Sequence, residues 1–266
     1  MRALYVPNTP TLLDVKLRPD GFPEHPATIQ ALSTIGDAWQ ALNLDAIVVI
    51  TPHFFSQDFI PFIADEHITQ IYDLDGFPES FYGIPYPAVG ATNLAQRLSS
   101  IAVQQMVPLH AVKSWGLDHG AWTPLSRLFP TAPCPLLPIG TGWRVSDAMH
   151  QKAGQLISAA STDLKIGVIA TGSLYHRLDL WTGTDRMMPK TASKSLDHIL
   201  TALRQGDFTS AFQIDTQDFA QLAPEGGFKP LALLAGTLEG LQPQVHDWAE
   251  ESEFGAVSLS TIEFIV

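Results

Sequence analysis

Residues 28–53 read TIQALSTIGDAWQALNLDAIVVITPH, and this stretch decides the fold class. Its first part repeats large apolar side chains at helical spacing, which predicts an amphipathic helix over residues 28–42. The following run, Ala46–Ile50, is short, apolar and partly β-branched, and it ends at a proline-containing turn, as buried strands do. Upstream, Ala3–Val6 has the same character. The order strand, helix, strand predicts two parallel strands joined by a crossover helix.

The rest of the chain continues this alternation. We expect a further buried strand at Ile166–Ala170 and a closing antiparallel edge strand at Ala256–Val266. Helical spacing recurs over residues 93–101, 149–160, 194–203 and 230–238. The proline-rich segment 77–90 predicts an ordered loop of the kind that often lines a pocket. The sequence therefore predicts one α/β domain over residues 1–266, with a mostly parallel central sheet and helices on both faces.

Composition excludes several classes of protein. Apolar residues make up 45% of the chain and charged residues 16%, which favours a folded domain over disorder. The formal net charge is −12, from 15 Lys and Arg against 27 Asp and Glu, so we expect no nucleic acid partner. The longest apolar runs are far shorter than the roughly 18 to 20 residues of a membrane helix, so we expect no membrane segment.

Cysteine usage predicts a cellular compartment. Cys134 is the single cysteine, so no intramolecular disulfide forms. The first residues lack the basic segment and apolar stretch of a signal peptide. We therefore expect a cytoplasmic protein.

Polar residues follow three of the predicted strands. Asn8 comes after Val6-Pro7, His53 after Thr51-Pro52, and His176 lies shortly after the strand at 166–170. Ligands of open α/β sheets bind outside the carboxyl ends of the strands, so we expect these three side chains to meet on one rim.

Two further candidates lie in glycine-rich motifs. His119 stands in GLDHGAW (116–122), where Asp118 is suited to cap a helix and the flanking glycines permit close approach. Glu225 stands in APEGGF (223–228), where a carboxylate enters an otherwise apolar helix and gains from the helix N-terminus. Each residue taken alone also has a structural explanation. A histidine after a strand or at a helix start can cap backbone groups, and so can Glu225.

These motifs resemble the class III extradiol ring-cleavage dioxygenases, a superfamily that includes protocatechuate 4,5-dioxygenase catalytic subunits, DOPA dioxygenases and Memo-like proteins. The resemblance spans nearly the whole chain. It is most specific in GLDHGAWTPL (116–125), GSLYHRL (172–178) and EGG (225–227). Residues 77–88 also look like the Pro- and Tyr-rich segment of DOPA dioxygenases, and Ile47–His53 looks like the family's second metal-bearing strand.

The resemblance implies a non-haem Fe(II) site of two histidines and one carboxylate, with open positions for a catechol-type aromatic diol and O2. His53 matches a metal-ligating histidine and Glu225 the carboxylate. His119 and His176 match acid/base histidines, although in the DOPA-type branch the position of His176 is a metal ligand. The family also implies a role in aromatic catabolism, and a homodimer or pairing with a second subunit.

The chain departs from the family at the first strand, where Asn8 takes the place of a histidine metal ligand. An amide oxygen is a weaker donor to Fe(II) than imidazole is, so metal affinity should fall. Three hypotheses follow. The first is an extradiol dioxygenase, and the second is a metal-deficient relative that binds a small aromatic or a partner chain without catalysis. The third is a Zn-dependent hydrolase, because histidines and a carboxylate also suit Zn²⁺. Arg177, Arg186 and Lys229 are interpreted as surface cations.

Overall fold

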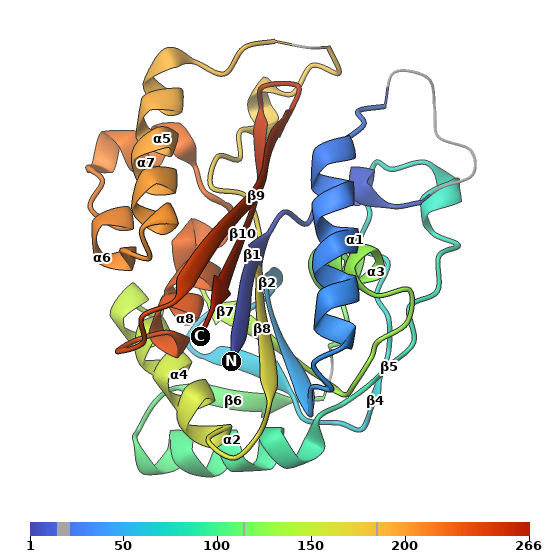
Figure 1. Cartoon of the computed structure of the whole chain (residues 1–266), viewed down its shortest axis with the longest axis vertical. Coiled ribbons are helices and arrows are strands. Elements are labelled where there is room, and N and C mark those ends of the chain that lie inside the picture. Colours follow the sequence, from blue (N-terminus) through green and yellow to red (C-terminus); the bar gives the residue numbers. More distant parts are fainter. Residues whose placement is uncertain (15–21, 114, 185) are drawn as a thin grey trace.

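A sheet of eight strands forms the centre of the computed structural model, which describes residues 1–14, 22–113, 115–184 and 186–266. The strands β2 (Ala46–Ser56), β8 (Ile166–Thr171) and β1 (Arg2–Val6) are adjacent and parallel in its middle (Figure 1). This arrangement confirms the predicted α/β class and its mostly parallel sheet.

The C-terminal strands complete one side of the sheet in antiparallel fashion. β10 (Val257–Ile265) pairs with β1, and β9 (Gln244–Glu253) pairs with β10 and forms the outer edge. The expected antiparallel strand at the C-terminus is therefore present, but a second strand that the sequence did not reveal lies outside it. Most side chains of β9 are exposed or half-buried. The strand therefore lacks the run of apolar residues from which a buried strand is predicted.

The opposite side of the sheet is built from shorter strands. Beyond β2 the order is β7 (Leu136–Gly142), β3 (Ile60–Ile63) and β6 (Leu109–Val112). A separate two-stranded sheet pairs β4 (His67–Ile68) with β5 (Ala88–Val89), and it brackets the proline-rich loop. Within that loop, a short 3₁₀ helix, η2, spans Glu79–Phe81.

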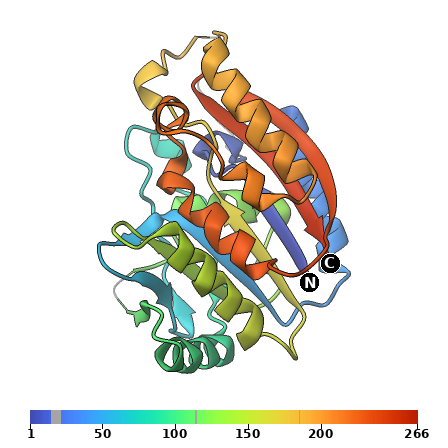
Figure 2. The ribbon, with the colours of Figure 1, turned by 90° about the vertical axis from the view of Figure 1, so that its left-hand side faces the viewer.

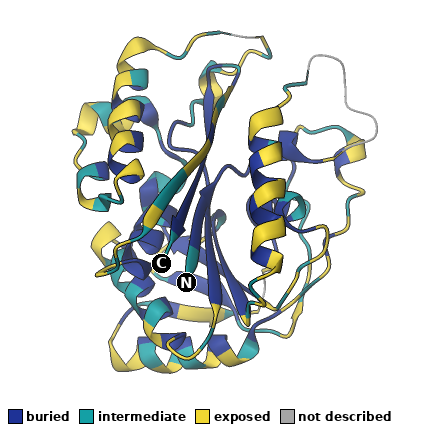
Figure 3. Cartoon of the chain, in the orientation of Figure 1, coloured by how far each residue is buried: buried dark blue, intermediate teal, exposed yellow. Residues whose placement is uncertain are grey.

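Alternate residues of the central strands serve two cores, one on each face of the sheet. Ile47 and Val49 of β2 contribute to one core, and Val48 and Ile50 contribute to the other. The first core is covered by α1 (Pro26–Gln40) and α3 (His119–Leu128). The second is covered by α2 (Thr92–Gln104), α4 (Asp147–Ala160), α5 (Lys190–Arg204) and α8 (Lys229–Thr237) (Figure 2). Two layers of helices thus enclose the sheet, whose strands are largely buried (Figure 3).

The predicted helices agree with α1, α2, α4, α5 and α8, with ends that differ by a few residues. The short helices α6 (Phe208–Ala211) and α7 (Thr216–Leu222) and the 3₁₀ turn η3 (Leu178–Leu180) were not predicted. Asp118 is the N-cap of α3 and accepts a hydrogen bond from the backbone N–H of Ala121, as expected. Among the described helices, none combines the length and the apolar character that crossing a lipid bilayer requires.

β2 is longer and less regular than predicted. The strand reaches Ser56, but its pairing with β7 shifts register between Ile50 and Phe55. Pro52 has no N–H with which to continue the ladder, which accounts for an interruption at this point. His53 therefore lies within the irregular carboxyl end of β2 and not beyond it. The ring of His53 lies beside that of His119, the first residue of α3, with ring centroids 4.0 Å apart.

A glycine controls how closely α1 and α3 approach. A Cβ atom at Gly36 of α1 would lie 1.7 Å from the backbone oxygen of Leu128 at the end of α3. Because α3 carries His119, this contact helps to set where His119 lies relative to the sheet.

We expect Gly36→Ala to destabilise the protein by about 1–3 kcal/mol, although alanine is the better helix former, because a backbone atom must move to admit the methyl group. Chemical denaturation measures the change. Gly83→Ala is the matched control, since nothing lies within 4 Å of its added Cβ. An unchanged or raised stability of Gly36→Ala would contradict the prediction.

Candidate active site

One cavity of about 560 Å³ collects the residues singled out from the sequence. It is lined by Asn8, His53, His119, His176 and Glu225. They arrive from separate elements: Asn8 follows β1, His53 lies in the last part of β2, His119 begins α3 and His176 follows β8. The sheet topology therefore brings together side chains that are far apart in sequence.

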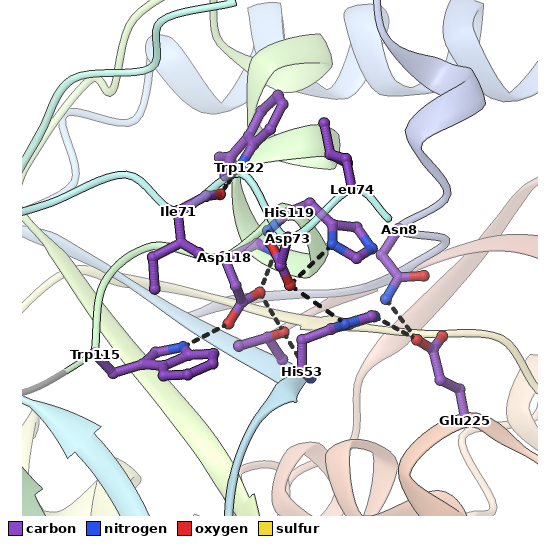
Figure 4. A network of polar contacts seen from close by, with 12 residues as sticks. Asn8, His53, Ile71, Asp73, Leu74, Trp115, Asp118, His119, Trp122 and Glu225 are labelled. Carbon is purple, nitrogen blue, oxygen red and sulfur yellow. Dashed lines mark hydrogen bonds and ion pairs between the residues drawn. The ribbon is translucent and has the colours of Figure 1, made fainter. Parts of the chain in front are cut away.

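The shortest contact in this pocket joins His53 to Glu225. The Nε2 atom of His53 lies 2.8 Å from Oε1 of Glu225, and Nδ2 of Asn8 donates to the same oxygen at 3.1 Å (Figure 4). The second carboxylate oxygen accepts the backbone N–H of Ser173 at 3.1 Å. Glu225 is thus held by three donors from three different parts of the chain.

The backbone around Glu225 differs from the expected helix start. Glu225 opens a 3₁₀ turn, η4 (Glu225–Phe228), and α8 begins only at Lys229. Gly226 and Gly227 both have positive φ, a conformation that glycine adopts without strain. The expected capping of the long helix by Glu225 is therefore wrong, because its carboxylate binds Ser173 and side chains of the pocket.

The His53–Glu225 contact changes the titration of both groups. Burial disfavours the charged form of His53, but the hydrogen bond and negative charge of Glu225 outweigh it and raise the pKa of His53 to about 9. Burial likewise opposes ionisation of Glu225, and the contact with His53 outweighs it and lowers the pKa of Glu225 to about 2. In the metal-free protein the two groups form an ion pair at neutral pH.

Asp73 is a site residue that the sequence did not reveal. Its Oδ1 accepts the backbone N–H of His119 at 2.8 Å, and its Oδ2 lies 3.0 Å from Nδ1 of His119. The same Oδ2 lies 3.6 Å from Nδ1 of His53, whose ring centroid is 4.0 Å from that of His119. Asp73 belongs to an irregular loop and follows no predicted strand. The one feature of the sequence that could have pointed to Asp73 is its position shortly before the proline-rich segment.

Asp118 fastens the start of α3 to the end of β2. Its Oδ1 accepts the Thr51 hydroxyl at 2.8 Å as well as the N–H of Ala121. Its Oδ2 accepts the indole N–H of Trp115 at 3.2 Å. Gly120 permits this proximity, since an added Cβ would lie 2.7 Å from the ring of His53. The close approach expected of these glycines is present.

His176 reaches the cavity from the segment after β8. Its backbone N–H donates to the oxygen of Leu222, and the residue bridges to Val257 at the start of β10. Its charge is among the influences that lower the pKa of Glu225. His176 therefore lies on the same pocket wall as Glu225, with its backbone fixed on both sides.

Two sets of donor atoms meet at His53. Nε2 of His53 and Oε1 of Glu225 are 2.8 Å apart, close to the roughly 3 Å between neighbouring ligands that bind a metal at about 2.1 Å. On the other side of the ring, His53, Asp73 and His119 offer ligand atoms within 4.8 Å of one another. Nitrogen and carboxylate donors suit Fe(II) and Zn²⁺. The residues present therefore fit a metal ion.

The mostly parallel sheet, with histidines and carboxylates gathered at its strand ends, defines an α/β protein with a candidate metal site at the edge of the sheet. Residues 4–259 match the family described as the catalytic LigB subunit of aromatic ring-opening dioxygenase, whose members are metal-dependent. This chain belongs to the LigB family of class III extradiol dioxygenases.

Similar proteins carry the same family's names. The chain is 28% identical to a 4,5-DOPA dioxygenase extradiol of Escherichia coli over 239 residues, which are 85% of this chain and 86% of that protein. It is 33% identical to a 4,5-DOPA dioxygenase extradiol of Beta vulgaris over 132 residues, about half of each chain (49% and 48%). A crystal structure of an uncharacterized protein from Escherichia coli K12 shares the fold, with a TM-score of 0.75, 21% identity and full coverage of both chains.

The His53–Glu225 ion pair predicts how the stability of the chelator-treated protein depends on pH. The lowered pKa of Glu225 adds stability above about pH 4.5, which is lost as the pH falls toward 2. The raised pKa of His53 adds stability below about pH 6.5, which is lost as the pH rises through 9. We expect the contribution of the pair to be complete between pH 4.5 and 6.5.

Urea denaturation of wild type and Glu225→Gln across pH 3 to 9 measures this contribution. The difference in free energy of unfolding between them should be largest near pH 5.5 and should shrink on both sides. Glu79→Gln removes an exposed carboxylate and serves as the control for net charge. A difference that is constant across the pH range would contradict the prediction.

Proposed function

We propose that this protein is an Fe(II)-dependent extradiol dioxygenase that opens the ring of a catechol-type substrate with O2. The observation that carries the proposal is the 2.8 Å contact of His53 with Glu225 in a pocket whose wall also holds His119 and His176. Family membership and relatives named 4,5-DOPA dioxygenase support the same reaction.

His53 and Glu225 hold the metal in this proposal, and Asn8 occupies the third, weaker position. Bound iron supplies coordination positions for the diol and O2 and the electrons that activate the oxygen. Loading requires His53 to give up the proton that it shares with Glu225, since a metal binds neutral imidazole. Asn8 currently donates its amide N–H to Glu225, so its side chain must turn to offer its oxygen.

The acid/base work falls to His119 and His176. Removal of a proton from a catechol hydroxyl strengthens its binding as an anion, and a histidine at the pocket wall suits this step. Asp73 contacts Nδ1 of His119, which leaves Nε2 as the nitrogen available to the substrate. The ring then opens at the bond beside the diol, and both atoms of O2 enter the product.

The apolar side chains of the pocket suit an aromatic ring. Leu74, Phe77 and Trp115 line the cavity together with the histidines. Trp115 is fixed by stacking on Phe54, with ring centroids 5.7 Å apart and planes at 4°. A flat substrate with a polar edge can therefore bury its ring while its diol faces Glu225.

One observation favours the metal-deficient alternative. Glu225 accepts hydrogen bonds from His53, Asn8 and Ser173, so the carboxylate is satisfied by protein donors alone. A relative that only binds a small aromatic or a partner subunit would keep such a closed network. Elemental analysis of protein purified without chelator separates the two readings, because stoichiometric iron excludes this alternative. Zinc there, with turnover of esters or amides, would instead support a hydrolase.

We further propose a cellular compartment, a metabolic role and an oligomeric state for the enzyme. A role in aromatic catabolism in the reducing cytoplasm agrees with the lone, half-buried Cys134 and with an Fe(II) centre that oxidation would inactivate. We propose a homodimer or a pairing with a second subunit, which the mass in solution will decide.

We expect His53→Ala to lower the iron content of the anaerobically loaded protein and to reduce ring opening at least 100-fold, because a principal ligand is removed. Iron is measured by mass spectrometry, and the product by its yellow absorbance across a panel of catechols. His67→Ala, at an exposed position of β4, is the control. If wild type binds iron and yields no product from any catechol in the panel, the proposed function is rejected.

His119→Asn distinguishes an acid/base residue from a ligand. We expect iron to remain bound while kcat falls by about 10²–10⁴-fold, the usual contribution of a general acid or base. His176→Asn in parallel decides the role of the second histidine: loss of iron would make it a ligand. Full activity of His119→Asn would contradict its assignment.

A further inference from the structure

Glu253 lines the same pocket, and the proposed reaction gives it no task. Its side chain is 6% exposed. Its Oε2 accepts the hydroxyls of Thr9 at 2.9 Å and Thr11 at 2.8 Å, and its Oε1 accepts the indole N–H of Trp181 at 3.2 Å. His25 lies 3.4 Å from Oε2. Burial opposes ionisation of Glu253, but the hydrogen bonds from His25, Thr11 and Thr9 outweigh it and lower the pKa of its carboxyl.

Glu253 lies close to the proposed metal ligands. Asn8 donates to Glu225, and the next residue, Thr9, donates to Glu253. The Cα atoms of adjacent residues are about 3.8 Å apart, so the two carboxylates flank a single dipeptide. A catechol whose diol faces Glu225 can therefore reach Glu253 with a short substituent.

The wall of the pocket is negatively charged. Its ionisable carboxylates are Asp73, Asp75, Glu225 and Glu253, and the lining residues that the structure describes include no lysine or arginine. Two basic side chains that lie close to the site motifs in sequence form ion pairs outside the pocket lining: Arg177 pairs with Asp179, and Lys229 pairs with Asp147. A bound divalent metal offsets two of these charges, and among the described residues the partners of Glu253 are two threonine hydroxyls, an indole N–H and the His25 ring.

Aromatic rings stand beside this carboxylate. Trp181 lines the cavity and is fixed both by its hydrogen bond to Glu253 and by an edge contact with Phe254. Phe22 and Phe77 also line the cavity. A carboxylate next to aromatic faces is the usual recognition chemistry for an ammonium group, through an ion pair and a cation–π contact.

On the basis of the proposed ring-opening function, we propose that the pocket selects catechols whose side arm ends in an ammonium group, with Glu253 and Trp181 as the recognition pair. A carboxylate-bearing arm meets like charge and is disfavoured. Glu253 is then a specificity residue for the substrate's arm, separate from the groups that handle its diol.

Calorimetry without O2 on the iron-loaded wild type tests this preference directly. The probes are three catechols with a short alkyl arm that ends in ammonium, methyl or carboxylate. We expect the ammonium form to bind about tenfold more tightly than the methyl form, which is the effect of one charged hydrogen bond. The carboxylate form should bind most weakly of the three.

Glu253→Gln identifies the residue responsible. We expect the affinity ratio of ammonium to methyl arm to fall about tenfold, with the affinity for the methyl arm little changed. Glu79→Gln is the matched control, because it removes the same charge from an exposed position outside the pocket. The wild-type series needs no variant, so it decides the preference even if Glu253→Gln folds poorly.

Binding of the carboxylate arm as tight as that of the ammonium arm would overturn the inference, and so would no binding of any of the three. Assays of ring opening in air keep the two proposals apart. An ammonium preference without product would reject the proposed function and support the selectivity. Product formed with a preference for the carboxylate arm would support the proposed function and reject the ammonium selectivity.

Discussion

The contact between His53 and Glu225 organises one end of this molecule. It joins the irregular end of β2 to the turn η4, two segments separated by 172 residues. Around it, Asn8 and Ser173 complete the partners of the carboxylate, while Asp73 faces the other nitrogen of the histidine. Because Glu225 is largely removed from water and His53 is half-buried, the charged form of each is favoured by the other. The ends of β1, β2 and β8 are thereby drawn to one point.

The pocket and the buried residues beside it concentrate acidic groups that water would otherwise solvate. Asp118 is satisfied by Thr51, Trp115 and the start of α3, and Glu253 is satisfied by two threonines and an indole. Each carboxylate therefore also ties together segments that are distant in sequence. A divalent cation and a cationic substituent are the ligands that such a lining accommodates best, since both lower the repulsion among the carboxylates.

Asn8 links the end of β1 to the carboxylate at the centre of the pocket. The neutral amide of Asn8 donates to Glu225 and helps to satisfy that carboxylate. This hydrogen bond favours the charged form of Glu225 and is among the contacts that lower the pKa of its carboxyl. Under the proposed function, a metal held by Glu225 would compete with this hydrogen bond, so the identity of residue 8 would influence the iron content of the protein.

The sequence by itself determined the fold class and five residues of the pocket. Apolar periodicity is local, so it predicts β1, α1 and β2 and places Asn8, His53 and His176 at strand ends. Asp73 and Glu253 were beyond its reach, because one lies in an irregular loop and the other ends the largely exposed strand β9. Only the tertiary structure decided that Glu225 binds His53 instead of capping α8, and that carboxylates surround the histidines. Those contacts join residues whose separation along the chain carries no signal of their distance in space.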